Sequence, residues 1–119
     1  MTVLEQIRQA ETRVPSEVLE EAVRRLVTVA DPEKIILFGS AARAEMRADS
    51  DLDLLVVKDG DYDQRRLTAL LYRVLADLDR DTYIVLASSA QLERYKDSFC
   101  LVLYAATREG KVIYDKAAL

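Results

Sequence analysis

The chain has 119 residues, of which 50% are hydrophobic and 32% are charged, and its 17 basic and 21 acidic residues leave a net charge of −4. This composition excludes a disordered tail, a collagen-like chain and a disulfide scaffold, and the length predicts a single domain over residues 1–119. The acidic balance excludes broad nucleic-acid binding, because phosphate neutralisation supplies most of the affinity of basic nucleic-acid binders.

The sequence has no feature of membrane insertion or secretion. No stretch approaches about 18 consecutive apolar residues, and charges begin at Glu5, so no signal peptide is expected. The single cysteine, Cys100, cannot form an intramolecular disulfide, which fits a reducing compartment. We therefore expect a cytoplasmic protein. The chain has no histidine, so carboxylates would hold any metal, which favours Mg²⁺ or Mn²⁺.

Hydrophobic spacing and turn residues divide the chain into helices and strands. Ser16 is the expected N-cap of the second helix, and Asp31-Pro32 ends that helix. The apolar run over residues 35–38 stops at Gly39 and predicts a buried strand. In chain order, the expected elements are helices over 2–12 and 16–30, strands over 35–38 and 52–57, a helix over 62–78, a strand over 82–87, helices over 89–96 and 98–109, and a strand over 111–114.

This order predicts a small mixed β-sheet flanked by helices, in the α/β or α+β class. The helix over 62–78 is amphipathic, and its apolar residues at helical spacing are expected to face the sheet. These residues are Leu67, Leu70, Leu71, Val74, Leu75 and Leu78.

The segment over residues 38–57 carries the residues that indicate chemistry. Gly39 follows a buried strand, at a point where a side chain would obstruct a close approach to the backbone. A helical turn that begins at Ser40 would offer free backbone N–H groups and a hydroxyl, which suit a phosphate. Ten residues separate Ser40 from Asp51, and Asp51 and Asp53 take positions i and i+2 of a strand. Both carboxylates therefore point to the same face.

Two carboxylates this close repel each other, and coordination of a divalent cation removes the repulsion. We therefore expect Asp51 and Asp53 to hold Mg²⁺ or Mn²⁺. A phosphate-binding turn, a carboxylate pair and a divalent cation are together typical of sites that catalyse phosphoryl or nucleotidyl transfer.

The pair Gly39-Ser40, followed after ten residues by Asp51-x-Asp53, resembles the signature of the polymerase-β-like nucleotidyltransferase superfamily. The small size is similar to that of its minimal nucleotidyltransferase (MNT) branch, of which many members are antitoxins of HEPN/MNT toxin–antitoxin pairs. Residues 92–95 and 108–114 are similar to the family's closing helix and strand. The resemblance implies the nucleotidyltransferase fold, Mg²⁺, an NTP such as ATP, and transfer of a nucleoside monophosphate to a hydroxyl. In the toxin–antitoxin members, that hydroxyl belongs to a tyrosine of the all-helical HEPN toxin, which adenylylation silences.

The resemblance also implies roles for individual residues. Gly39 and Ser40 match the phosphate-gripping pair, and Arg43 matches the arginine that follows this turn and meets the triphosphate. Asp51 and Asp53 match the metal-binding acids.

Two positions depart from the family's pattern. Ala44 replaces the glycine that commonly follows the arginine. The family usually has a third carboxylate at the start of the third strand, as base and metal ligand, and the matching position here is Tyr83. Asp81 lies on the same face, about 6.5 Å further along the strand, and is the candidate that could take the role of this third catalytic acid.

Two functions are therefore kept open. The first is Mg²⁺-dependent transfer of AMP from ATP to a hydroxyl of a partner protein, with a HEPN-type toxin as the expected partner. The second, which Tyr83 favours, is a catalytically degraded binding module that neutralises its partner by complex formation. Loss of general base assistance commonly costs about 10²–10⁴-fold in rate. Neither a homo-oligomer nor a hetero-oligomer is excluded.

Overall fold

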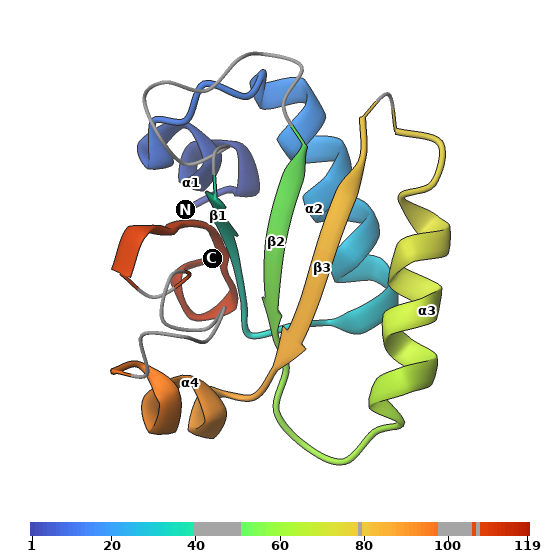
Figure 1. Ribbon diagram of the computed structural model, residues 1–119. Helices are drawn as coiled ribbons and strands as arrows, with labels where there is room; N and C mark the ends of the chain where they lie inside the picture. The colour runs from blue at the N-terminus through green and yellow to red at the C-terminus, as the bar shows by residue number, and fades with distance from the viewer. Residues whose placement is uncertain (40–50, 79, 98–105, 107) are drawn as a thin grey trace.

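The structure is a computed structural model that describes residues 1–39, 51–78, 80–97, 106 and 108–119. Its elements are α1 (Val3–Ala10), α2 (Ser16–Ala30), β1 (Lys34–Phe38), β2 (Leu52–Val57), α3 (Gln64–Val74), β3 (Thr82–Ala87), α4 (Ser89–Tyr95), β4 (Lys111–Asp115) and the short 3₁₀ helix η2 (Lys116–Ala118). Figure 1 shows a twisted sheet with α1 and α2 behind it and α3 along one side.

The four strands form one sheet in the order β3-β2-β1-β4. Strand β1 is antiparallel to both β2 and β4, whereas β2 and β3 are parallel. The connection between the two parallel strands contains α3, as a parallel pair requires a long crossover. The predicted mixed sheet flanked by helices is therefore confirmed, with strands β2 and β3 at the predicted bounds.

Alternation along the strands gives each face of the sheet its own apolar cluster. Helices α1, α2 and α3 cover the face that contains the larger cluster, to which β1 and β2 contribute Ile35, Leu37, Leu52, Leu54 and Val56. The second face carries the smaller cluster of Ile36, Phe38, Leu55, Val57, Ala87 and Ala106, with Val85 and Leu92 packed against it. Asp53 belongs to this second face, because it alternates with Leu52 and Leu54 along β2.

Both edge strands are covered by polar side chains from helices. At β4, Gln6 of α1 donates from Nε2 to the carbonyl oxygen of Asp115 (3.0 Å) and accepts from its N–H (2.6 Å). At β3, the hydroxyl of Tyr72 in α3 accepts from the N–H of Ile84 (2.9 Å). Unpaired edge groups are sites at which another chain can pair, so these contacts reduce edge-to-edge association.

Helix α3 is shorter than the predicted helix over 62–78. It begins after Asp63, whose side chain accepts from the N–H of Arg66 (3.1 Å) and caps the helix, and the regular helix ends at Val74. The prediction that Leu70 faces the sheet is wrong, because its side chain is 39% exposed while Leu71 is fully buried. Adjacent helical residues point about 100° apart, and here Leu71 takes the buried side of α3 while Leu70 lies toward solvent.

Helix α2 also begins differently from the prediction. Pro15 is its N-cap, and its carbonyl oxygen accepts from the N–H groups of Val18 (3.1 Å) and Leu19 (3.3 Å). Ser16 is the first helical residue, and no side chain caps this helix. The predicted turn at Ser40 and most of the predicted helix over 98–109 lie outside the described residues. Within the described part of the chain, no helix is long and apolar enough to cross a membrane.

Candidate functional site

Asp53 lies in the middle of a row of three side chains on the second face of the sheet. The register pairs Asp53 with Phe38 of β1 on one side and with Tyr83 of β3 on the other. Asp51 is exposed and directly precedes the first residue of β2, the strand that carries the half-buried Asp53. The structure therefore brings together the predicted acid pair and Tyr83.

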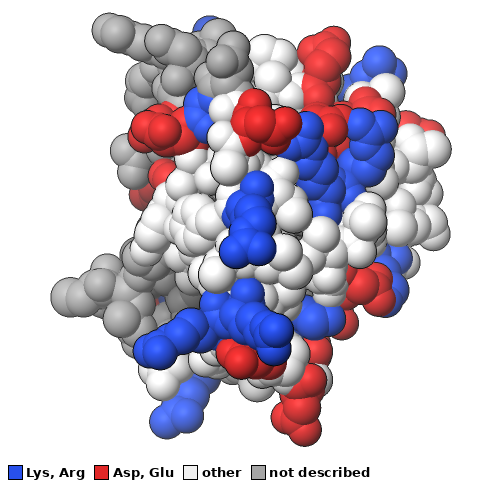
Figure 2. Space-filling model, turned by 90° about the vertical axis from the view of Figure 1, so that its right-hand side faces the viewer, with Lys and Arg blue, Asp and Glu red and all other residues white. Residues whose placement is uncertain are grey.

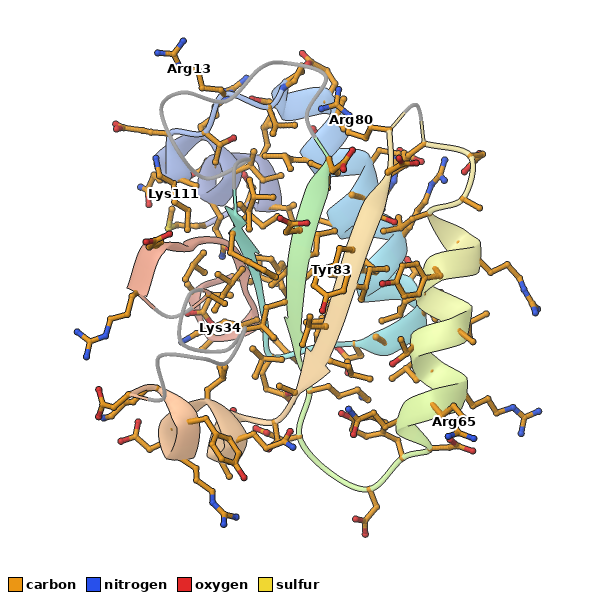
Figure 3. The ribbon with its side chains drawn as sticks, in the orientation of Figure 1. Arg13, Lys34, Arg65, Arg80, Tyr83 and Lys111 are labelled. Carbon is orange, nitrogen blue, oxygen red and sulfur yellow. The ribbon has the colours of Figure 1, made fainter. Side chains whose placement is uncertain are left out.

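The rings of Phe38 and Tyr83 lean toward each other above β2. Their strands are two strand spacings apart, which is about 9.5 Å, but the ring centroids are 6.4 Å apart with an angle of 70° between the planes. Phe38 is 5% exposed and Tyr83 is 46% exposed. The Asp53 carboxylate thus has a buried aromatic wall on one side and an open aromatic wall on the other. Figure 3 shows Tyr83 projecting over the sheet beside β2.

Gly39, at the end of β1, makes space for the Asp53 carboxylate. A Cβ at position 39 would lie 2.0 Å from Oδ2 of Asp53, and the φ of Gly39 is +68°. The left-handed backbone disfavours any L side chain, and a Cβ here would also force the Asp53 carboxylate to move. The predicted reason for a glycine here was a close approach to the backbone, and the atoms that approach it are those of Asp53.

The electrostatic environment of Asp53 disfavours its ionised form. Partial burial of the carboxylate, and secondly the negative charge of Asp51, raise its pKa above the ordinary value. The first cause is consistent with the position of Asp53 between the rings of Phe38 and Tyr83, of which the Phe38 ring is buried.

The two carboxylates fit a hard divalent cation. Asp51 and Asp53 offer only oxygen donors, which Mg²⁺ prefers. A cation between them would offset both the repulsion from Asp51 and the burial of the Asp53 charge. This pair is therefore the candidate metal-binding site of the chain.

The structure does not bring Asp81 into a three-acid cluster with this pair. The N–H of Leu52 donates to the carbonyl oxygen of Asp81 (2.9 Å), which places the Asp81 backbone beside the start of β2. However, the described residues contain no group of three or more Asp, Glu, His or Cys side chains that could hold a metal ion. The side chain that neighbours Asp53 on β3 is that of Tyr83.

Two candidate phosphate-binding residues, Ser40 and Arg43, lie outside the described residues, as does Ala44. The sequence interpretation also missed one residue of the site. Phe38 was identified only as part of a strand, and it forms the buried wall beside Asp53. Its position directly before Gly39 could have indicated this role, because the residue before a phosphate-binding turn ends the strand beside the acids.

Two other surface features lie apart from the acid pair. A cavity of about 670 Å³ lies at the other end of β1 and β2, where Lys34, Val57 and Leu92 contribute to its lining. Figure 2 shows basic side chains on the side of the molecule that carries α3, and Arg65 projects from the outer side of this helix in Figure 3. We assign the candidate site to the acid pair rather than to this cavity, because the acid pair belongs to the Gly39–Asp53 segment and its Asp53 carboxylate lies against Gly39.

The family model described as "Polymerase beta, Nucleotidyltransferase" matches residues 20–118, a range that contains the whole candidate site. No curated protein matches the chain.

Proposed function

Because the chain belongs to the polymerase β nucleotidyltransferase family, we propose that it transfers a nucleoside monophosphate, AMP from ATP, to a hydroxyl of a partner protein. The observation that carries this proposal is the carboxylate pair Asp51 and Asp53 at the entrance of β2, with Asp53 held against Gly39. We further propose that the chain is a cytoplasmic MNT-type antitoxin and that its partner is an all-helical HEPN-type toxin. This finer assignment is supported by the small size of the chain, which is similar to that of the MNT branch.

In this proposal, Asp51 and Asp53 hold Mg²⁺, which when bound neutralises phosphate charge and favours departure of pyrophosphate. Gly39 keeps the turn after β1 free of a side chain, so that Ser40 and Arg43 can contact the triphosphate. Phe38 excludes water from the inner side of Asp53, which strengthens electrostatic interactions at that carboxylate. Asp81, whose backbone lies beside the start of β2, is the proposed base for the acceptor hydroxyl.

A second function is favoured by the position of Tyr83. The residue beside Asp53 on β3 is a tyrosine, whereas the family resemblance places a third carboxylate there. In this alternative, the chain binds nucleotide weakly or not at all and neutralises its partner by complex formation. The two functions differ in the effect of Asp53→Asn. This variant abolishes transfer to the partner if the chain is an enzyme, and it leaves complex formation and toxin silencing intact if the chain is a binding module.

Thermal unfolding with and without Mg·ATP tests the nucleotide site. A ligand at about a hundredfold its dissociation constant stabilises the folded state by about 2.7 kcal/mol, which for a domain of this size raises the Tm by on the order of ten degrees. We expect such a shift with Mg·ATP and its loss with ATP plus EDTA or in the Asp51→Asn variant. Asp61→Asn is the matched control, because Asp61 is an exposed acid in the loop before α3. A shift that persists in Asp51→Asn would contradict the assigned site, and no shift in the wild type would favour the binding module.

A further inference from the structure

We propose that the hydroxyl of Tyr83 is itself an acceptor of the nucleotidyl group, so that the chain carries an adenylylation site inside its own candidate active site. This inference rests on the proposed function, because it needs ATP bound at Asp51 and Asp53. It names one acceptor within the chain and does not exclude a partner protein as another.

The first observation is the position of Tyr83. Its register partner on β2 is Asp53, and the two side chains point to the same face of the sheet because paired residues of neighbouring strands do so. The centroid of its ring lies 6.4 Å from that of Phe38, which is on the far side of β2. The two rings therefore approach each other over the strand that carries Asp53, which places the Tyr83 ring beside that strand.

The second observation is that this hydroxyl is free to react. Tyr83 is 46% exposed, and no hydrogen-bond partner of its hydroxyl is present among the described residues. The hydroxyls of Tyr62 and Tyr72 donate to the carbonyl oxygens of Lys58 (3.2 Å) and Ile84 (3.4 Å). Among these three phenols, only that of Tyr83 is both beside the acid pair and unengaged.

The reaction balances with ATP as the only co-substrate. The phenolic oxygen of Tyr83 attacks the α-phosphorus, and a bond forms between them. The bond from the α-phosphorus to the oxygen that bridges to the β-phosphate breaks, and pyrophosphate leaves with that electron pair. The phenolic proton passes to solvent. The products are the chain with AMP esterified to Tyr83 and one pyrophosphate.

The modification limits itself to one event per chain. The added nucleotide is bulky, and Tyr83 stands beside Asp53 in the same row. The attached AMP would therefore occupy the space above the carboxylate pair and hinder the next ATP. Incubation with Mg·ATP should add one adenylate to each chain and then stop.

Intact-mass spectrometry after incubation with Mg·ATP tests the inference. We expect a mass gain of one adenylate in the wild type, its absence in Tyr83→Phe and Asp53→Asn, and wild-type labelling in Tyr72→Phe. Tyr83→Phe keeps the ring and its contact with Phe38, and a cooperative thermal transition will verify that it is folded. Labelling that persists in Tyr83→Phe would overturn the inference.

A second readout does not depend on transfer. Tb³⁺ takes oxygen ligands, and its luminescence increases when a tyrosine ring lies close enough to transfer excitation energy to it. We expect excitation of tyrosine to sensitise Tb³⁺ bound by the wild type, with most of the signal lost in Tyr83→Phe and retained in Tyr72→Phe. Equal signals in wild type and Tyr83→Phe would contradict the placement of Tyr83 over the acid pair.

The two readouts and the Mg·ATP thermal shift separate the possible failures. A thermal shift without a mass gain overturns the self-acceptor role and leaves the proposed nucleotide site standing. The absence of both the thermal shift and the sensitised Tb³⁺ signal overturns the proposed nucleotide site, and the self-acceptor role with it.

Discussion

The carboxylate of Asp53 occupies the space that a side chain at Gly39 would need, since a Cβ at position 39 would fall 2.0 Å from Oδ2 of Asp53. Gly39 directly follows β1, whereas Asp53 lies within β2. The contact links the turn after β1 to the acid pair at the start of β2. The Asp53 carboxylate takes its observed position because residue 39 has no side chain.

Gly39→Ala should therefore destabilise the protein and impair nucleotide binding. A left-handed φ costs an L-residue roughly 1–2 kcal/mol, and displacement of the Asp53 carboxylate adds to this cost. We expect the free energy of unfolding to fall by roughly 2–4 kcal/mol, measured by urea unfolding followed by circular dichroism. The Mg·ATP thermal shift should be lost as well. Gly60→Ala is the control, because Gly60 has a φ of +94° but no atoms near its missing Cβ. The Gly60→Ala variant should be destabilised by backbone strain alone and should keep the Mg·ATP thermal shift.

Asp53→Asn should stabilise the metal-free protein at neutral pH. Because the folded-state pKa of Asp53 is raised by burial and by Asp51, its charge opposes folding at pH values above that raised pKa. The opposition disappears below the ordinary value of 3.8, where the carboxyl is protonated in both states. The variant should therefore unfold at a higher urea concentration than the wild type at pH 7, and the two midpoints should converge near pH 3. A variant less stable than the wild type at pH 7 would contradict this account of the site.

Tyr83→Asp should increase the affinity for Mg²⁺. A carboxylate at position 83 would neighbour Asp53 across β2 and β3, and its attraction to a divalent cation about 4 Å away is about 2 kcal/mol even in water. We expect roughly tenfold or tighter binding of Mg²⁺ by isothermal titration calorimetry. Tyr83→Asn introduces a side chain of nearly the same shape as that of Tyr83→Asp, but without its charge. This variant should bind Mg²⁺ no more tightly than the wild type. Equal affinities of the two variants would place position 83 outside the metal site.

Gln6→Leu should weaken the cover over strand β4. Gln6 is 6% exposed and satisfies both backbone groups of Asp115. Leucine would leave these groups without partners, at a cost of about 1–3 kcal/mol for a buried polar group. We expect a loss of about 2 kcal/mol in urea unfolding. Gln9→Leu, at an exposed position of the same helix, should change stability by less than about 0.5 kcal/mol, and a similar loss in both variants would argue against the specific role of Gln6.

Arg25→Met should make the protein less stable at neutral pH and less sensitive to acid. The guanidinium of Arg25 bonds to Glu21 (2.8 Å), Asp77 and the carbonyl oxygen of Val74 (2.9 Å), which joins α2 to the end of α3. Its hydrogen bonds lower the pKa of Glu21 and of Asp77. The stabilisation is therefore fully present above the ordinary values of 4.5 and 3.8 and is lost as pH falls through the lowered values.

The measurement is the urea midpoint of wild type and Arg25→Met between pH 7 and pH 2. The difference between the two proteins should be constant near neutrality and should shrink at the acidic end. Arg24→Met is a control for loss of an ion pair within α2, since Arg24 pairs only with Glu21 of the same helix among the described residues. A difference that stays constant down to pH 2 would mean that packing of the Arg25 stem, and not its ion pairs, links the two helices.

Local patterns in the sequence were enough to predict most of the elements and the acid pair. The strands over 52–57 and 82–87 have the predicted bounds, because an apolar run between turn residues is a property of neighbours in the chain. The same holds for Asp51 and Asp53, since their spacing alone directs them to one face of a strand. Predictions at helix ends were less accurate, because the hydrophobic spacing that predicts a helix does not specify the residue at which it starts or stops: α2 has Pro15 as its N-cap and α3 ends at Val74.

By itself, the sequence determined the mixed α/β class, the order of the elements and the two acids beside a glycine turn. Only the tertiary structure decided that Phe38, Asp53 and Tyr83 form one row, that Gly39 makes space for Asp53, and that Leu70 faces outward. The physical reason is that alternation within a strand assigns a face but not a register. Register results from packing between strands that are distant in the chain, and this long-range packing places a tyrosine beside the candidate metal-binding acids.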